Sequence, residues 1–276
     1  MSLLSPDQLG VALYPDRLLL ARSGGLLRRR LKHKQIIAVA PAGADAPLWQ
    51  PAVDALVSQV AAGAMAGAEV TLVLSNRFVN YALVPYSDAI GGADEELAFV
   101  RHCFSRVHGS QADGWACRLS QASPGKTRLA CGIEQTLVDA LAKVMTPLGN
   151  HYRSLQPHLM ASFNRWRTRL ARQPGWFVVA EPGLLSLAML CDGQWHSVRT
   201  LKVGPDWPQE LPGVLSREEF LVGSHTQCDE VLLFAPDAAQ PLMLEAGKWR
   251  INTLLPTLLP GMTAGADAPF SMALGA

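Results

Sequence analysis

The stretch LGVALYPDRLLLAR, residues 9–22, decides the fold. It holds two short apolar runs separated by Pro15-Asp16. Apolar runs of this length, bounded by turn residues, are typical of buried strands joined as a hairpin. Ser23-Gly24-Gly25 then turns the chain into a longer run that continues to Val39. The opening of the chain therefore predicts a meander of three antiparallel strands.

A helix and a fourth strand follow the meander. The loop at 40–47 leads into a stretch from about Leu48 to Ala62 whose apolar residues lie close to helical spacing. VTLVLS, residues 70–75, is a continuous apolar run of the length of a buried strand. The order of elements in the first half is therefore βββαβ.

The second half repeats this order. GWFVVAEPGLLSLAML, residues 175–190, is a second pair of apolar runs around a Pro-Gly turn, and QWHSVRTLKV at 194–203 predicts the third strand. Ser216 is a suitable cap for a helix over 217–222, and EVLLFA at 230–235 predicts another buried strand. Two copies of βββαβ indicate an internal duplication.

Between the copies lies a predicted α+β insert. Its expected elements are a strand at 77–86, a helix that begins near Asp94, two strands at 115–120 and 127–133, and a helix at 134–146. Gln156-Pro157 then opens a helix that links the two lobes. The predicted domains are a first lobe at 1–173, with the insert at about 77–155, and a second lobe at 174–276.

Composition excludes several classes of protein. The chain has 276 residues, of which 49% are apolar and 17% are charged, so it can bury a sizeable core. The net charge of +1 argues against a strongly basic nucleic-acid binder, and no run of eighteen uncharged apolar residues is present. The N-terminus lacks the basic start of a secretory signal, and the five scattered cysteines suit reduced thiols. We therefore expect a soluble, cytoplasmic protein.

The charge is divided unevenly between the halves. Residues 1–173 carry nineteen basic and twelve acidic residues, or +7, whereas residues 174–276 carry five basic and eleven acidic residues, or −6. This asymmetry fits two surfaces with different partners. It fits equally well two lobes that face each other across a polar cleft.

The layout resembles the actin-like fold of the cell-division protein FtsA, of the type IV pilus protein PilM and of the type II secretion protein GspL. Two strings strengthen the pilus and secretion side of this resemblance. SLQPHLMASFNRW at 154–166 is similar to the point where PilM and GspL leave the insert, and FSMALGA at 270–276 is similar to the ending of actin-like pilus proteins. The resemblance implies an α/β fold of duplicated ribonuclease-H-like lobes with a small α+β insert.

The resemblance also shows where this sequence departs from nucleotide-binding relatives. In those proteins a D-x-G turn after the first strand of each lobe aims backbone N–H groups at phosphate and positions magnesium. Here the first turn contains Tyr14-Pro15-Asp16 and no glycine. The second turn keeps Glu181, Gly183 and Ser186 but gains Pro182, which has no N–H to donate. We expect no cofactor, with ATP and magnesium as the alternative, bound through Asp16, Glu181, Gly183 and Ser186.

By resemblance, the chain is expected to be a non-catalytic scaffold of a pilus or secretion platform, peripheral at the inner membrane. Its partner would be an inner-membrane protein, bound through a short N-terminal peptide. In PilM such a peptide docks in a groove between the insert and the first lobe, and the resemblance implies the same groove here. The residues expected to line this groove are Leu83, Val84, Leu97 and Val100. An actin-like ATPase and a sugar-kinase-like phosphotransferase are the alternatives, and a homodimer stays open.

The run LLRRRLKHK at 26–34 is the densest group of charges. Near an anionic membrane its basic residues would be attracted to lipid head groups. Charged residues also protect the edge strand of a sheet from aggregation, which explains the alternation as well. The residues concerned are Arg28, Arg29, Arg30, Lys32 and Lys34.

Other strings carry weaker signals. Gly125-Lys126-Thr127 lacks the first glycine of a phosphate loop, because residue 120 is serine, so a hairpin turn is expected. The histidines and cysteines near 102–108 and 225–228 do not complete a zinc site. RINTLLPTLLP at 250–260 is expected to be a C-terminal helix of the second lobe. It also resembles the short asparagine–leucine–proline motif with which PilM's membrane partner begins, so the alternative is a segment that docks in the chain's own partner groove.

Overall fold

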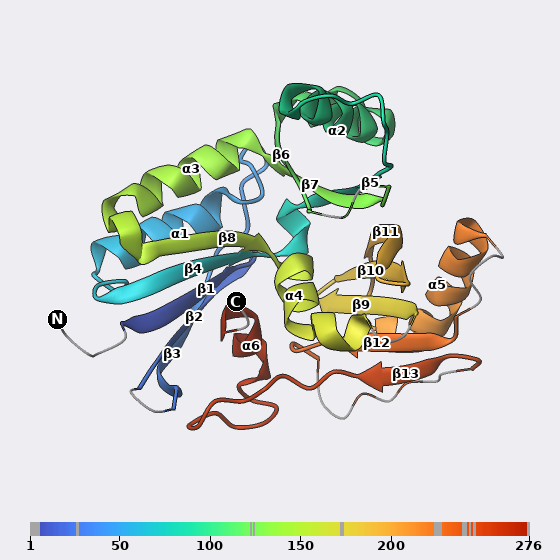
Figure 1. The fold of residues 1–276 in the computed structure, drawn as a ribbon. Coiled ribbons are helices and arrows are strands. Elements are labelled where there is room, and N and C mark those ends of the chain that lie inside the picture. The colour runs from blue at the N-terminus through green and yellow to red at the C-terminus, as the bar shows by residue number, and fades with distance from the viewer. Residues whose placement is uncertain are drawn as a thin grey trace. The chain divides into compact units, whose positions relative to one another are not determined.

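The protein is described from a computed structural model (Figure 1). The structure describes residues 6–25, 28–121, 123, 125–171, 174–223, 228–238, 242, 244 and 247–274. The chain forms two compact units. The first unit contains residues 1–79, 134–165 and 256–276, and the second contains residues 80–133 and 166–255.

The sheet of the first unit has the strand order β3-β2-β1-β4-β8. The first three strands are antiparallel, whereas β4 runs parallel to β1 and β8 runs parallel to β4. The strands are β1 (Asp7–Leu13), β2 (Arg17–Gly24), β3 (Arg30–Ala38), β4 (Ala68–Leu74) and β8 (Tyr152–Pro157).

The sheet of the second unit repeats this topology, in the order β11-β10-β9-β12-β13. Again three antiparallel strands are followed by two parallel ones. The strands are β9 (Gly175–Glu181), β10 (Leu184–Cys191), β11 (Gln194–Lys202), β12 (Glu230–Phe234) and β13 (Arg250–Thr253). The predicted duplication is confirmed, and each copy has a fifth strand that the sequence pattern did not predict.

A backbone hydrogen bond is repeated in both sheets. The N–H of Val39, just after β3, donates to the carbonyl of Asp16 in the β1–β2 turn at 2.8 Å. The N–H of Val203, just after β11, donates to the carbonyl of Gly183 in the β9–β10 turn at 3.2 Å. The third strand of each meander is thus tied to the first hairpin in the same way.

Helices α1 (Gln50–Ala61) and α3 (Gln135–Met145) pack side by side in the first unit (Figure 1). Trp49, which precedes α1, donates its indole N–H to the Glu134 carboxylate at 2.7 Å and so joins the beginnings of the two helices. Both helices bury short apolar stripes, among them Leu56 and Leu141. Helix α4 (His158–Leu170) begins where β8 ends, two residues later than predicted.

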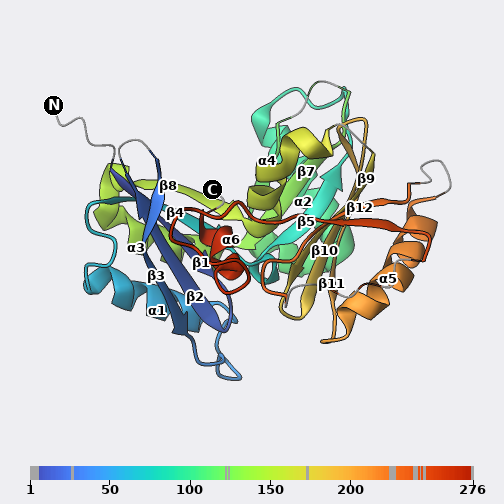
Figure 2. The same cartoon turned by 90° about the horizontal axis from the view of Figure 1, so that it is seen from below.

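The end of the chain packs against the same sheet. Residues 256–274, which we call the C-terminal segment, include η4 (Ala268–Phe270) and α6 (Ser271–Leu274). Phe270 and Met272 share one buried cluster with Ala12, Leu19 and Val73 of the sheet. Figure 2 shows the segment, in red, against the blue strands of this unit. The apolar half of this sheet face is therefore covered by the chain's own end.

The expected helix over 250–260 is wrong. Residues 250–253 form β13, residues 254–259 have no regular secondary structure, and a turn begins at residue 260. Two prolines, at 256 and 260, interrupt any helical hydrogen-bond ladder in this stretch, which explains the difference.

The core of the second unit lies between its sheet and helix α5 (Trp207–Val222). Trp176, Leu187 and Leu211 are among its fully buried members. The prediction that this helix begins after Ser216 is wrong, since Ser216 lies in mid-helix and bonds the Pro212 carbonyl at 2.9 Å. The helix includes two prolines, at 208 and 212, and Pro208 lies in the first turn, where its missing N–H costs nothing.

The insert is a three-stranded sheet under one helix. Its strand order is β5-β7-β6, from β5 (Asn80–Val84), β7 (Arg128–Glu134) and β6 (Trp115–Leu119), and α2 (Ala93–His108) covers one face. Strand β11 lies against β5, which explains why residues 80–133 group with the second unit. The compact units thus cross the predicted limits at 173/174, because the insert joins the second unit and the C-terminal segment joins the first.

The close packing of Gly10 against the backbone of Ala273 predicts that an added methyl group at Gly10 destabilises the fold. A Cβ at Gly10 would lie 1.6 Å from the carbonyl oxygen of Ala273 in α6. Neither backbone has room to move without loss of packing, so Gly10→Ala should lower the free energy of unfolding by about 1–3 kcal/mol. Urea denaturation measures this loss. Gly43→Ala is the control, since nothing lies within 4 Å of its added methyl group; equal stability of the two variants would contradict the observed packing.

The ion pair between Lys34 and Asp267 predicts a pH dependence. The hydrogen bond from Lys34, together with the Thr263 N–H at 2.8 Å, holds the pKa of the buried Asp267 carboxyl below its ordinary value. A lowered pKa stabilises the fold above the unfolded-state pKa of about 4, and this contribution is lost as the pH falls through the folded pKa. Asp267→Asn should therefore be less stable at pH 7 and lose less stability on acidification.

Urea denaturation at pH 7 and at pH 3 checks this expectation. Asp16→Asn is the matched control, since the Asp16 side chain is 63% exposed and its ion pair with Arg17 is 3.5 Å long. Identical pH dependence of Asp267→Asn and the unsubstituted protein would show that the pair does not bind the C-terminal segment to β3.

Candidate functional site

The first turn uses its backbone groups within the hairpin. The Tyr14 N–H donates to the Arg17 carbonyl at 2.9 Å, and Pro15 has no N–H, so neither residue offers a donor to phosphate. The Tyr14 ring is buried in the cluster under α6, with the Arg17 guanidinium 4.3 Å from its centroid. Asp16 points its carboxylate to solvent. The side chains of this turn thus serve packing and solvation.

The second turn is closer to a phosphate-binding turn. Gly183 has φ +70°, a conformation that favours glycine, and forms a two-residue turn with Pro182. Glu181, the last residue of β9, is 3% exposed. Ser186 lies two residues into β10 and is fully buried; among the described residues none accepts from or donates to its hydroxyl. Three of the four predicted nucleotide contacts therefore come from one hairpin, and Asp16 comes from the other unit.

Polar residues that the sequence reasoning missed follow the parallel strands of the first unit. Ser75 and Asn76 come directly after β4, and His158 comes directly after β8; all three are buried. Asn76 accepts the Leu159 N–H at 3.0 Å and so satisfies a donor at the beginning of α4. Ligands in open α/β sheets bind at this edge, beyond the carboxyl ends of the strands. The polar pair directly after the apolar run VTLVL could have marked it.

The four predicted partner residues lie in the insert, but on different faces. Val84 and Val100 are 1% and 2% exposed in the core beneath α2, and Leu97 packs half-buried against this core. A partner cannot reach Val84 or Val100, so these two residues are removed from the predicted contact surface. Leu83 alternates with Val84 along β5 and lies half-buried on the opposite face of the sheet.

The basic run lies mostly on β3, at the edge of the sheet, and its side chains are largely exposed. Lys32 pairs with Asp7 at 2.5 Å, and Lys34 pairs with Asp267. Leu26 and Leu27 lie outside the described residues. Within the described part of the chain, Arg28, Arg29 and Arg30 have no ion pair. The three arginines are thus the part of the run whose charge is available to a ligand.

Other candidates for chemistry find little support in the structure. In the described part of the chain no three His, Cys, Asp or Glu residues come together as a metal site would require, and His225 lies outside that part. Burial raises the pKa of Cys131 to about 11, and it also raises the pKa values of Cys103, Cys117, Cys191 and Cys228. A raised pKa opposes the thiolate that nucleophilic catalysis needs. Gly125, with φ +80°, lies in the turn between β6 and β7, as predicted.

Comparison with solved structures finds proteins of the same architecture. The chain superposes on a structure titled PilM–PilN type IV pilus biogenesis complex with a TM-score of 0.67, 16% identity, and coverage of 97% of this chain and 96% of that chain. The fold is actin-like. The cytoplasmic domain of EpsL, an inner-membrane component of the type II secretion system of Vibrio cholerae, superposes with a TM-score of 0.58, 12% identity, and coverage of 98% and 95%.

A third structure of this fold is a Bacteroides thetaiotaomicron protein described as having an actin-like ATPase fold and unknown function. Its TM-score is 0.58 at 11% identity, with coverage of 96% of this chain and 95% of that chain. No protein-family model and no curated protein matches the sequence. In the described part of the chain no helix is long and apolar enough to cross a membrane.

The geometry of the turns predicts the response to nucleotide. Millimolar Mg-ATP should leave the melting temperature unchanged, because Tyr14 and Pro15 offer no donor and Asp16 faces solvent. A ligand present at a hundred times its Kd would stabilise the protein by about 2.7 kcal/mol, which a thermal shift assay detects readily. A clear rise that disappears in Glu181→Ala would show that the second turn binds nucleotide without help from the first.

Proposed function

We propose that this chain is a non-catalytic, cytoplasmic scaffold of a type IV pilus or type II secretion platform that binds the N-terminal segment of an inner-membrane partner. The observation that carries the proposal is the actin-like fold, insert included, shared over 97% of the chain with a structure from a PilM–PilN complex. The cytoplasmic domain of a secretion component shares the same architecture over 98% of the chain.

The turns support a scaffold rather than an ATPase. An actin-like ATPase needs phosphate donors and a protected carboxylate in both lobes. The first turn has a buried aromatic ring, a proline and an exposed aspartate instead. The second turn retains Gly183 and the buried Glu181, which is the specific observation in favour of an ATP-binding protein as the second candidate.

We place the partner contact at the face of β5 that carries Leu83. Val84 and Val100 fill the core beneath α2, so this face is the one on which β5 offers an apolar side chain outside that core. Cross-strand pairing puts Leu83 opposite Leu129 on β7, which is 2% exposed, so Leu83 is the member of this pair that a partner can reach. Extended apolar peptides bind such surfaces through side-chain pockets and backbone pairing.

The test is a titration with a synthetic peptide. Where the neighbouring gene encodes a membrane protein with a single span, the N-terminal segment of that protein supplies the peptide. Leu83→Asp should weaken its binding at least about 100-fold, since an unpaired charge buried against apolar peptide costs several kcal/mol and each 1.4 kcal/mol is tenfold in affinity.

Val107→Asp is the matched control for this titration. Val107 lies on α2 in the same insert and is 74% exposed. The substitution therefore adds the same charge to the insert at a position outside β5. Circular dichroism shows whether both variants fold. If folded Leu83→Asp binds the peptide as tightly as Val107→Asp does, the partner contact lies elsewhere.

A further inference from the structure

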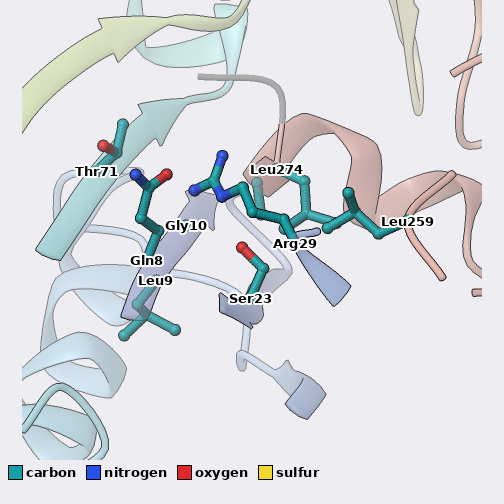
Figure 3. Close-up of a pocket in the computed structure, with 9 residues that line it drawn as sticks. Gln8, Leu9, Gly10, Ser23, Arg29, Thr71, Leu259 and Leu274 are labelled. Carbon is teal, nitrogen blue, oxygen red and sulfur yellow. The ribbon is translucent and has the colours of Figure 1, made fainter. Parts of the chain in front are cut away.

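A small hollow lies on the sheet face of the first unit, beside α6 (Figure 3). Its floor is formed by the beginning of β1 and by neighbouring residues of β2 and β4, and Leu259 and Leu274 of the C-terminal segment form one wall. The hollow is small, with a volume of about 40 Å³, and it is partly open to solvent. The close packing of the Ala273 carbonyl on Gly10 sets this wall directly against the sheet.

The floor of the hollow is polar. In register, Gln8 of β1 pairs with Ser23 of β2, and Gly10 of β1 pairs with Thr71 of β4, so the side chains of all these positions share one face. Further along the same face the side chains become apolar, with Ala12 and Val73 buried under α6. The hollow thus lies where the covered, apolar half of the face ends and hydroxyl and amide groups begin.

Arg29 brings a positive charge to this floor. Figure 3 shows its guanidinium directed toward the side of the hollow where Gln8 and Thr71 lie. None of the residues that line the hollow is acidic. Proteins bind oxyanions with such a set of donors, namely a guanidinium, hydroxyl groups and a side-chain amide NH₂.

The charge of Arg29 is not neutralised by an ion pair. Lys32 and Lys34 of the same basic run each have an acidic partner, whereas Arg29 pairs with no carboxylate in the part of the chain that the structure describes. Arg29 has an electrostatic interaction with the Glu69 carboxylate. That carboxylate, however, accepts a hydrogen bond from Arg153. That hydrogen bond and, to a lesser extent, the charges of Arg153, His151 and Arg29 lower the pKa of Glu69.

We propose that this hollow binds a small oxyanion of the phosphate class, held by the Arg29 guanidinium with Gln8, Ser23 and Thr71 as further donors. The same chemistry would accept free phosphate or the head-group phosphate of an anionic lipid. The site is independent of the partner contact on β5.

The experiment compares three proteins: the unsubstituted chain, Arg29→Gln and Arg28→Gln. Arg28 is the matched control, since it is an exposed neighbour of the same charge that does not line the hollow. Inorganic phosphate is titrated in a thermal shift assay against sodium chloride of equal ionic strength. In parallel, binding is measured to phosphatidylcholine vesicles with and without phosphatidylglycerol.

We expect phosphate to raise the melting temperature of the unsubstituted chain and of Arg28→Gln, with an affinity at least about tenfold lower in Arg29→Gln. Vesicle binding that depends on Arg29 and not on Arg28, without a response to inorganic phosphate, supports the site with lipid as its source. Absence of both responses, or equal losses in the two arginine variants, overturns the proposal.

Discussion

The first unit depends on the contact between Gly10 and Ala273. A sheet has two faces, and the apolar residues on each face must be covered. Helix α1 packs against α3 and β2. The C-terminal segment covers the cluster of Ala12, Leu19 and Val73. The carbonyl of Ala273 occupies the space where a side chain at Gly10 would begin. This approach is closed to every residue but glycine, so the end of the chain is fixed to its first strand.

Several features of the first unit follow from that contact. The C-terminal segment approaches β3 closely enough for Asp267 to pair with Lys34 and for the Leu31 N–H to donate to the Pro260 carbonyl at 3.1 Å. Where the segment ends, the sheet face is left partly uncovered, and the polar hollow with Arg29 lies there. The same run of basic residues thus serves two purposes, since Lys34 holds the C-terminal segment whereas the arginines stay available.

How far the sequence predicts this structure depends on how strongly each element is buried. The strands around Pro15-Asp16 and Pro182-Gly183 were predicted within a few residues, because fully buried strands are continuous apolar runs. Strands β8 and β13 were missed, because YRSLQP and RINT have the mixed composition of strands that lie last in a sheet. Burial of Val84 rather than Leu83 depends on which face α2 covers, and a single strand cannot show that. The contact of Ala273 with Gly10 joins the two ends of the chain, which no local pattern predicts.

The two duplicated turns depart to different degrees from the geometry of a phosphate-binding turn. Both turns keep the hydrogen bond from the third strand, so the hairpin geometry is preserved in each copy. In the first copy, Tyr14 has become part of the core under α6, and a phosphate-binding role would require that core to open. In the second copy, Gly183 keeps its left-handed conformation and Glu181 stays buried. The departure of the first turn from a phosphate-binding geometry is therefore built into the packing of the first unit.

Hydrogen–deuterium exchange across the whole chain, measured with the partner peptide and separately with Mg-ATP, tests the central claim most directly. The claim is that this actin-like chain binds a membrane partner through its insert and does not bind nucleotide. We predict that the peptide slows exchange in residues 80–84 and that Mg-ATP changes exchange at neither turn. Protection of residues 13–18 and 181–186 by Mg-ATP, with no protection of the insert by the peptide, would contradict the claim.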